Sequence, residues 1–156
     1  MFELVIEYLK GVFESNPAVK TIAHGVSNDI DLEKKNMYPL VHIQWQNMEL
    51  DGQGINYTFD IHVLRLRDQT KAINNVVWQA NQSEINNYSI CSDIAIKAIT
   101  TLRNTNNDIT MPDGFINTLE LVSTTSPEAV TLEYMNMLDG VNFQLTVQVN
   151  NTIGGC

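Results

Sequence analysis

The first residues repeat apolar positions with the period of an α-helix. These apolar residues, three or four positions apart, are Phe2, Val5, Ile6, Leu9 and Phe13. Because this spacing puts them on one side of a helix, residues 2–14 are predicted to form an amphipathic helix. Asn16-Pro17 ends it, since the residue before a proline is disfavoured in helical conformation. A helix lying on a membrane surface is the alternative, but Lys10 is the only cation among residues 1–14, so packing on a core is favoured.

Two segments then alternate between apolar and polar residues, which is the period of a β-strand. They run from Tyr38 to Leu50 and from Asn56 to Leu66, and a turn near Gly52 separates them. The pattern predicts a long β-hairpin. The apolar pairs expected across it are Val41 with Val63, Ile43 with Ile61, and Trp45 with Phe59. The polar pairs are His42 with His62, Gln44 with Asp60, and Gln46 with Thr58. A slip of one residue would mix apolar with polar partners, so the pattern itself favours this register or one shifted by two residues.

A second helical pattern runs from Ser83 to Arg103. Its apolar stripe consists of Ile85, Tyr88, Cys91, Ala95, Ala98, Ile99 and Leu102. An asparagine-rich stretch at 104–108 is expected to break this helix. Two segments between the first helix and this one are ambiguous: residues 19–26 are a short strand or a connection, and residues 67–81 are a long connection rich in apolar residues.

The last third of the chain has the pattern of strands. Residues 115–123 are one strand candidate, and Asp139-Gly140 lies between two others at 130–138 and 141–150. An Asp-Gly pair between alternating segments predicts a two-residue hairpin turn. That turn would place Tyr134 opposite Leu145.

The order of elements predicts an α+β fold. A mostly antiparallel sheet would carry the two amphipathic helices on one face, and the first hairpin would protrude from it. Residues 1–151 are expected to form a single domain, which is long enough to bury a substantial core. Residues 152–156 are expected to be a flexible C-terminal tail.

Composition and charge narrow the class of protein. Hydrophobic residues make up 44% and charged residues 17%, which is too apolar for a disordered chain. No apolar run approaches the ~20 residues of a membrane span, and the N-terminus lacks the features of a secretory peptide. The formal net charge of −9 argues against a surface that binds phosphates. Cys91 and Cys156 suggest no disulfide framework, which favours a reducing cytoplasm.

Few residues have a spacing that indicates chemistry. In the predicted hairpin register His42 and His62 are cross-strand neighbours with Asp60 diagonal to His42, a possible zinc or nickel site. An exposed polar sheet face is the favoured interpretation, since no third ligand has a defined position. Cys91 falls on an apolar helix stripe and is expected to pack in the core. We find no nucleotide-binding, hydrolase or metalloprotease motif, so no enzyme and no cofactor is predicted.

The hydrophobic pattern favours a protein-binding role instead. The ends of the first hairpin carry Met48, Leu50, Leu64 and Leu66, and the following connection carries Trp78. This is more apolar surface than a monomer normally exposes. The edge strands of a sheet add unpaired backbone groups that recruit a neighbour. Assembly with other copies of the chain would use both features.

The order of elements resembles the tail terminator and tail-completion (neck) proteins of tailed bacteriophages. The resemblance spans nearly the whole chain. It rests on the amphipathic opener 2–13, on Tyr38-Pro39-Leu40-Val41 entering a long hairpin, on the helix 83–103, on residues 115–123 with Pro127-Glu128, and on Leu138-Asp139-Gly140 with the closing strand 141–149. Those proteins are small α+β subunits that form a ring, usually of six, at the head-proximal end of the tail.

The resemblance implies a structural role in the virion, with assembly in the host cytoplasm. The partners would be other copies of the chain, the tail-tube protein and the neck proteins, and DNA would pass through an axial channel without specific binding. Contacts are expected at the hairpin loop and the connection that follows it. The candidate interface residues are Met48, Leu50, Asp51, Gly52, Gln53, Ile55, Val76, Val77 and Trp78. The alternatives are a non-viral adaptor module and a small enzyme with a pocket between sheet and helices.

Overall fold

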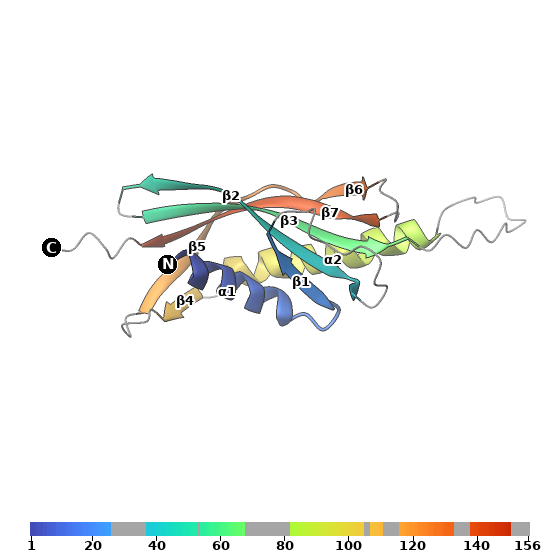
Figure 1. Cartoon of the computed structure of the whole chain (residues 1–156), viewed down its shortest axis with the longest axis horizontal. Helices are drawn as coiled ribbons and strands as arrows, with labels where there is room; N and C mark the ends of the chain where they lie inside the picture. The colour runs from blue at the N-terminus through green and yellow to red at the C-terminus, as the bar shows by residue number, and fades with distance from the viewer. Residues whose placement is uncertain are drawn as a thin grey trace, which may run out of the picture.

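The computed structural model describes residues 1–25, 37–52, 54–67, 82–104, 107–110, 116–132 and 138–150. These residues form two helices and a seven-stranded mixed sheet, which confirms the predicted α+β class (Figure 1). None of the described helices combines the length and the apolar character that a membrane crossing requires. The elements, in chain order, are α1 (Phe2–Glu14), β1 (Thr21–His24), β2 (Leu40–Asp51), β3 (Gly54–Leu66), α2 (Gln82–Asn104), β4 (Asn107–Thr110), β5 (Ile116–Thr124), β6 (Glu128–Leu132) and β7 (Leu138–Asn150).

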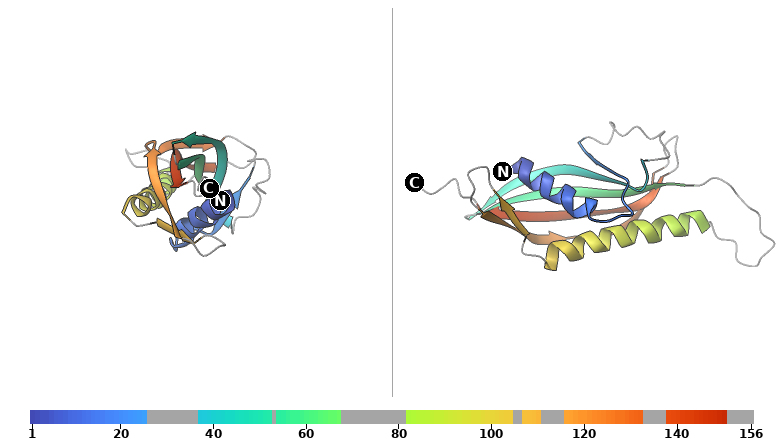
Figure 2. Two further views of the ribbon diagram at one scale, coloured as in Figure 1. Left: turned by 90° about the vertical axis from the view of Figure 1, so that its left-hand side faces the viewer. Right: turned by 90° about the horizontal axis from the view of Figure 1, so that it is seen from below.

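The strands follow the order β1-β2-β3-β7-β5-β4, and β6 also pairs with β7. Within this described sheet, β1 and β2 are parallel and all the other pairs are antiparallel. β5 and β6 pair with different stretches of β7, β5 with Leu145–Val149 and β6 with Leu138–Asn142. The sheet curls strongly, and α1 and α2 close the open side of the curl (Figure 2). Both helices therefore cover the same inner face, as predicted.

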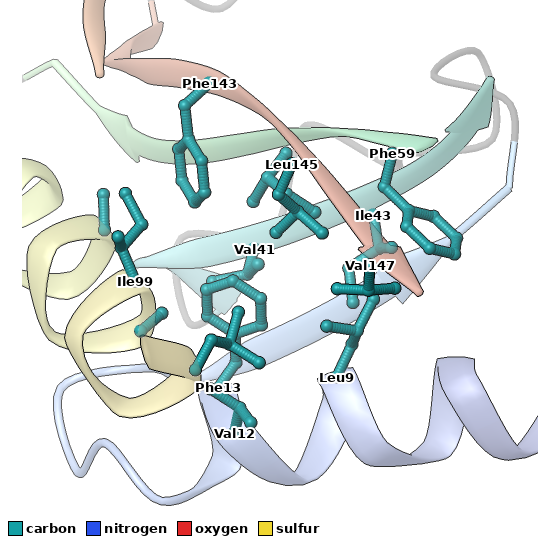
Figure 3. Packing of buried hydrophobic residues seen from close by; sticks show 14 of the residues in the cluster. Leu9, Val12, Phe13, Val41, Ile43, Phe59, Ile99, Phe143, Leu145 and Val147 are labelled. Carbon is teal, nitrogen blue, oxygen red and sulfur yellow. The ribbon is translucent and has the colours of Figure 1, made fainter. Parts of the chain in front are cut away.

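The core lies between the two helices and the middle of the sheet. Alternate residues of β3 and β7 point inward, where Phe59 and Leu145 are completely buried. Leu9 and Phe13 of α1 and Ile99 of α2 point toward them (Figure 3). Burying one such side chain contributes about 1.5–3 kcal/mol. The amphipathic pattern of the two helices is therefore matched by one continuous apolar face on the sheet.

The register of the first hairpin is confirmed from Val41–Val63 through Trp45–Phe59, including His42–His62 and Gln44–Asp60. The predicted pair of Gln46 with Thr58 is wrong. A β-bulge between Trp45 and Asn47 leaves Gln46 as an extra residue, so that Asn47 pairs with Thr58. Adjacent residues of a strand point to opposite faces, so a shift of one residue reverses the face of every later side chain. Beyond the bulge, each side chain of β2 therefore faces the side opposite to the predicted one.

The predicted turn at Asp139-Gly140 is also wrong. Both residues lie inside β7, and β6 pairs with the start of that strand, so that Val130 faces Gly140. A Cβ atom on Gly140 would lie 2.0 Å from the carbonyl oxygen of Val63. Gly140 is therefore needed because the backbones of β7 and β3 approach each other closely here. In the sequence, a glycine after an aspartate looks like a turn signal instead.

Several smaller features differ from the prediction. The asparagine-rich stretch was expected only to break the helix, but strand β4 begins within it. Two contacts hold this strand: Ile109 is buried, and the side-chain amide of Asn107 donates a hydrogen bond to the carbonyl of Leu102, 2.9 Å away. Ile85 lies on the exposed side of α2 and not in its buried stripe. Leu64 is buried in a second apolar cluster with Leu40 and Leu138. The predicted flexible tail, 152–156, lies outside the described residues.

Candidate assembly interface

One long stretch of the sheet edge lies next to no other strand of the described part of the chain. β1 pairs only with Leu40–Ile43, the first third of β2. Among the described residues, nothing pairs with the open side of β2 from Gln44 to Asp51, whereas β3 on its other side is paired throughout with β7. Such an edge offers backbone N–H and C=O groups to another chain. We call residues 44–51 the open edge.

The bulge in β2 decides which side chains line the inner face along the open edge. Past the bulge Met48 pairs with Tyr57 and Leu50 pairs with Ile55, and both of these partners point into the core. If Gln46 instead occupied a regular strand position opposite Thr58, Met48 and Leu50 would face the polar outer side. The bulge thus extends the apolar inner face toward the closed end of the hairpin.

On β2 the extended part of this face is exposed, although the residues paired with it on β3 are buried. The exposed fractions of the side chains rise toward the closed end of the hairpin, from 48% for Trp45 to 54% for Met48 and 71% for Leu50. Figures 1 and 2 show that this end of the sheet extends past the start of α1. We call Trp45, Met48 and Leu50 the hairpin patch. It is a row of large apolar side chains on an open strand, which is typical of a protein-binding surface.

Aromatic residues form the boundary between the core and the hairpin patch. The ring of Phe2, in the first turn of α1, lies 5.4 Å from the ring of Trp45 and 5.7 Å from that of Tyr57, measured between centroids. The indole Nε1 of Trp45 donates a hydrogen bond to the carbonyl of Asn47, 3.0 Å away. Trp45 is therefore held in place across the bulge, with one side packed on Phe2 and the other open.

The hairpin end is acidic. Glu49 and Asp51 are exposed, and they alternate along the strand with Met48 and Leu50. The sequence has no lysine or arginine between residues 36 and 64. Because adjacent residues of a strand point to opposite faces, a partner that binds at the open edge meets the apolar side chains on one face of β2 and the two carboxylates on the other.

The residues proposed from the sequence separate into three groups. Met48, Leu50, Asp51 and Gly52 are exposed at the hairpin end, where Gly52 has the positive φ of 58° expected in a tight hairpin turn. Ile55 is only 7% exposed and belongs to the core. Gln53 and Val76, Val77 and Trp78 lie outside the described residues.

Trp45 was missed because the sequence pattern placed it in the core opposite Phe59. It does pair with Phe59, but α1 begins too far along the sheet to cover it. The alternation of apolar and polar residues in β2 does not show where α1 begins along the sheet.

The two histidines lie together but are not arranged as metal ligands. The rings of His42 and His62 are 6.0 Å apart between centroids, and His42 Nε2 donates to the carbonyl of Gly25, 2.8 Å away. Asp60 accepts a hydrogen bond from Gln144 Nε2 at 3.1 Å. In the described part of the chain, no three His, Cys, Asp or Glu residues converge on a point where a metal ion could bind.

Burial sets the protonation of the histidines. It lowers the pKa of His42, an effect that the hydrogen bond to Gly25 opposes and the charge of His62 reinforces. Burial also lowers the pKa of His62, and Asp60 opposes that shift. Both imidazoles are therefore neutral at pH 7. The two histidines are ordinary partly buried members of strands β2 and β3.

The outer face of the sheet is polar and hydrogen-bonded to itself. Three cross-strand pairs join β3 to β7 through their side chains: Asn56 with Gln148 at 2.9 Å, Thr58 with Thr146 at 3.1 Å, and Asp60 with Gln144 at 3.1 Å. These bonds stabilise the pairing of β3 with β7. They leave a largely neutral surface.

At the far end of β3, a buried ion pair joins three elements. Arg67 binds both carboxylate oxygens of the fully buried Asp139, and Asn87 of α2 donates to the same carboxylate at 3.2 Å. Cys91, nearby on α2, is also buried, and burial raises the pKa of its thiol to about 12. A thiol with such a pKa is not a nucleophile at neutral pH. This cluster therefore has a structural role.

In comparisons with known proteins, no family model matches the chain and no curated protein sequence matches it.

Proposed function

We propose that this chain is a structural subunit that assembles with copies of itself into a ring, in the manner of a tail terminator or tail-completion protein of a tailed bacteriophage. The observation that carries the proposal is the hairpin patch on the open edge of β2. Six copies are the expected number. The ring would lie at the head-proximal end of the tail, in the virion, between the tail-tube and neck proteins.

The hairpin patch has the chemistry of an interface. Tryptophan is among the residues that most often dominate binding energy, and Trp45 is already held in one position by Phe2 and Asn47. A side chain held in place loses little conformational entropy on binding. The open edge next to it supplies backbone donors and acceptors, so that a partner gains both apolar burial and hydrogen bonds.

The charge of the chain agrees with a role around a DNA channel. A net charge of −9 on each subunit repels a polyphosphate, so DNA would pass without being retained. The outer sheet face, with its neutral amide and hydroxyl pairs, likewise offers no site for phosphate. The proposed partners are therefore proteins, and DNA makes no specific contact.

The first experiment measures the mass of the protein in solution by light scattering coupled to size exclusion. The wild-type chain should form a ring of about six copies, visible in negatively stained micrographs. The variant Met48→Glu/Leu50→Glu should be monomeric, because charges in the hairpin patch would lose their hydration on burial. Ile116→Lys is the matched control, since Ile116 is 69% exposed on β5 and lies outside the hairpin patch. This control should assemble normally.

A second experiment tests the place in the virion. The protein is co-expressed with a tail-tube protein, and the complex is purified on a tag on the tube protein. We expect the wild-type chain to co-purify as a cap on tube ends, and the Met48→Glu/Leu50→Glu variant to be lost. A wild-type chain that stays monomeric both alone and with the tube protein would refute the proposed function.

A further inference from the structure

The exposed side of α2 is a second apolar surface. Ile96 is 56% exposed, and the exposed cations Lys97 and Arg103 lie on the same half of the helix. Within the described part of the chain, neither cation forms an ion pair. A hollow of about 240 Å³ separates this half of α2 from the turn between β5 and β6. The hollow is lined by Ile96, Ile99, Thr100, Arg103, Thr124, Thr125, Ser126 and Pro127.

The shape of this surface fits a protein side chain better than a small molecule. A volume of about 240 Å³ is below the range of about 300–1,000 Å³ that is usual for small-molecule sites. A second depression, of about 420 Å³, lies on the other side of Ile96, but α2 alone lines it, so it encloses nothing. Ile96 and Thr100 form a ridge between the two hollows. We call this ridge and the two hollows the α2 groove.

The hairpin patch and the α2 groove are complementary in charge. At the hairpin end, Met48 and Leu50 alternate with Glu49 and Asp51, which lie on the other face of the open edge, while the half of α2 that carries Ile96 also carries Lys97 and Arg103. The two cations are six residues apart on a helix, about 9 Å along its axis. The two carboxylates are two residues apart on a strand, about 7 Å. Long side chains readily span this difference. Asp93, at the edge of the groove, leaves it one net positive charge.

We infer that the hairpin end of one copy docks by its open edge into the α2 groove of the next copy, with Leu50 against Ile96 and the acidic side of the same edge toward Lys97 and Arg103. This inference rests on the proposed function, since it names the two surfaces through which the ring would form. The surfaces come from different elements, so the contact is heterologous: each copy offers its hairpin end to one neighbour and its groove to the other. Repetition of such a contact closes a ring when the rotation from one copy to the next divides a full turn evenly.

The competing arrangement is a two-fold contact in which the open edges of two copies pair with each other. That contact would use the hairpin patch without the α2 groove, and it would stop at a dimer. The experiment below separates the two arrangements, because only the docking of hairpin into groove depends on Ile96.

The experiment uses two single variants and their mixture. Leu50→Lys removes the apolar contact and puts a cation against Lys97 and Arg103, while its own groove stays intact. Ile96→Lys disrupts the groove, while its own hairpin stays intact. Alone, each variant should associate at least tenfold more weakly than the wild-type chain. Mixed one to one, they should form a pair of one copy each, because one good contact remains possible between them.

Two controls accompany the mixture. Ile85→Lys introduces the same substitution on the same helix, at a residue that is 45% exposed and outside the groove, and it should assemble like the wild-type chain. Circular dichroism, and the unfolding midpoint measured under monomeric conditions, should be unchanged in all three variants, since all three positions are exposed. Raising the ionic strength from 0.05 to about 0.5 M should weaken wild-type assembly, because the expected ion pairs are exposed to solvent.

A covalent test identifies the contacting residues directly. In a Cys156→Ser background, Leu50→Cys and Thr100→Cys are combined in one chain and oxidised. Docking of hairpin into groove predicts a ladder of cross-linked species that ends at the copy number of the ring. Each single-cysteine variant should give no ladder.

The outcomes distinguish the inference from the proposed function. If Ile96→Lys assembles like the wild-type chain while Leu50→Lys does not, the inference is wrong and the proposed ring remains. If the wild-type chain is monomeric with and without the tube protein, both are wrong. The mixed pair together with a ladder that stops at the ring number supports both.

Discussion

The inner face of the sheet carries large apolar residues along its whole length, yet its middle and the open edge of β2 differ in exposure. Under the helices, Phe59 and Leu145 are fully buried, whereas at the closed end of the hairpin Leu50 is 71% exposed. Residue type does not explain the difference, since leucine occurs in both places. Position in the sheet does: Ile55, which pairs with Leu50 from the inner strand β3, is only 7% exposed, whereas β2 has an open side here and extends past the start of α1 (Figure 1). We call the region around Phe59 and Leu145 the covered end and the hairpin patch the uncovered end.

The covered end is expected to provide stability and the uncovered end to provide binding. A monomer gains nothing from a row of exposed apolar side chains, because their burial requires a partner. The bulge at Trp45–Asn47 strengthens this interpretation, since it turns Met48 and Leu50 away from the polar outer face. Mutations at the covered end should therefore lower the free energy of unfolding, whereas mutations at the uncovered end should weaken assembly.

The largest expected effect is at the covered end. Phe143→Ala should lower the free energy of unfolding by about 3–5 kcal/mol, because it leaves a cavity in the packed core. Leu50→Ala, at the uncovered end, should change it by less than about 0.5 kcal/mol. Denaturant titration of both variants under monomeric conditions measures the contrast. Similar values for the two would show that the hairpin patch is part of the core in solution.

An intermediate effect is expected at the buried ion pair. Asp139→Asn keeps the size of the side chain but removes the charge that Arg67 binds on both of its carboxylate oxygens. Arg67 is partly exposed and regains some hydration, so a loss of about 2–3 kcal/mol in unfolding free energy is expected. The same titration measures it, with Asp108→Asn on β4 as an exposed control. An unchanged midpoint for Asp139→Asn would contradict the structural role of the pair.

The smallest effect is a dependence on pH. The pKa values of His42 and His62 are below 6.5 in the folded chain, so the unfolded chain takes up protons first as pH falls. Stability is complete above pH 6.5 and declines from there toward the folded pKa values, by at most about 1.4 kcal/mol per pH unit for each histidine. Unfolding free energies from pH 7.5 to 5.5 should show this decline.

His42→Gln should reduce the slope of that decline, because it removes one of the two groups that take up protons on unfolding. Equal slopes in the wild-type chain and in His42→Gln would mean that His42 is accessible to protons in the folded state.

Much of the fold follows from local pattern. Helices α1 and α2 and the register from Val41–Val63 to Trp45–Phe59 were all predictable, because periodicity reports which face of an element is apolar. The bulge at Gln46 was not predictable, since one extra residue in a strand leaves a normal alternation of apolar and polar residues on each side of it. The Asp139-Gly140 prediction failed for a related reason. In this structure Gly140 is required by the close backbone of Val63, and Asp139 is required by Arg67. In the sequence, the same two residues are indistinguishable from a hairpin turn.

The candidate interface was only partly predictable. Met48 and Leu50 were selected from their place at the end of the hairpin, but Ile55 is in the core and Trp45 is not. The α2 groove had no sequence signal, because a single exposed isoleucine on a helix is common and the turn between β5 and β6 is distant in sequence.

By itself, the sequence determined which residues are apolar, the period at which they recur, and hence the elements and the face that each one buries. The tertiary structure alone decided where that burial stops: how far α1 extends along the sheet, how the bulge redirects the end of β2, and which strand pairs with the start of β7. The physical reason is that periodicity is a property of neighbouring residues, whereas coverage depends on the relative positions of elements that are distant in the chain.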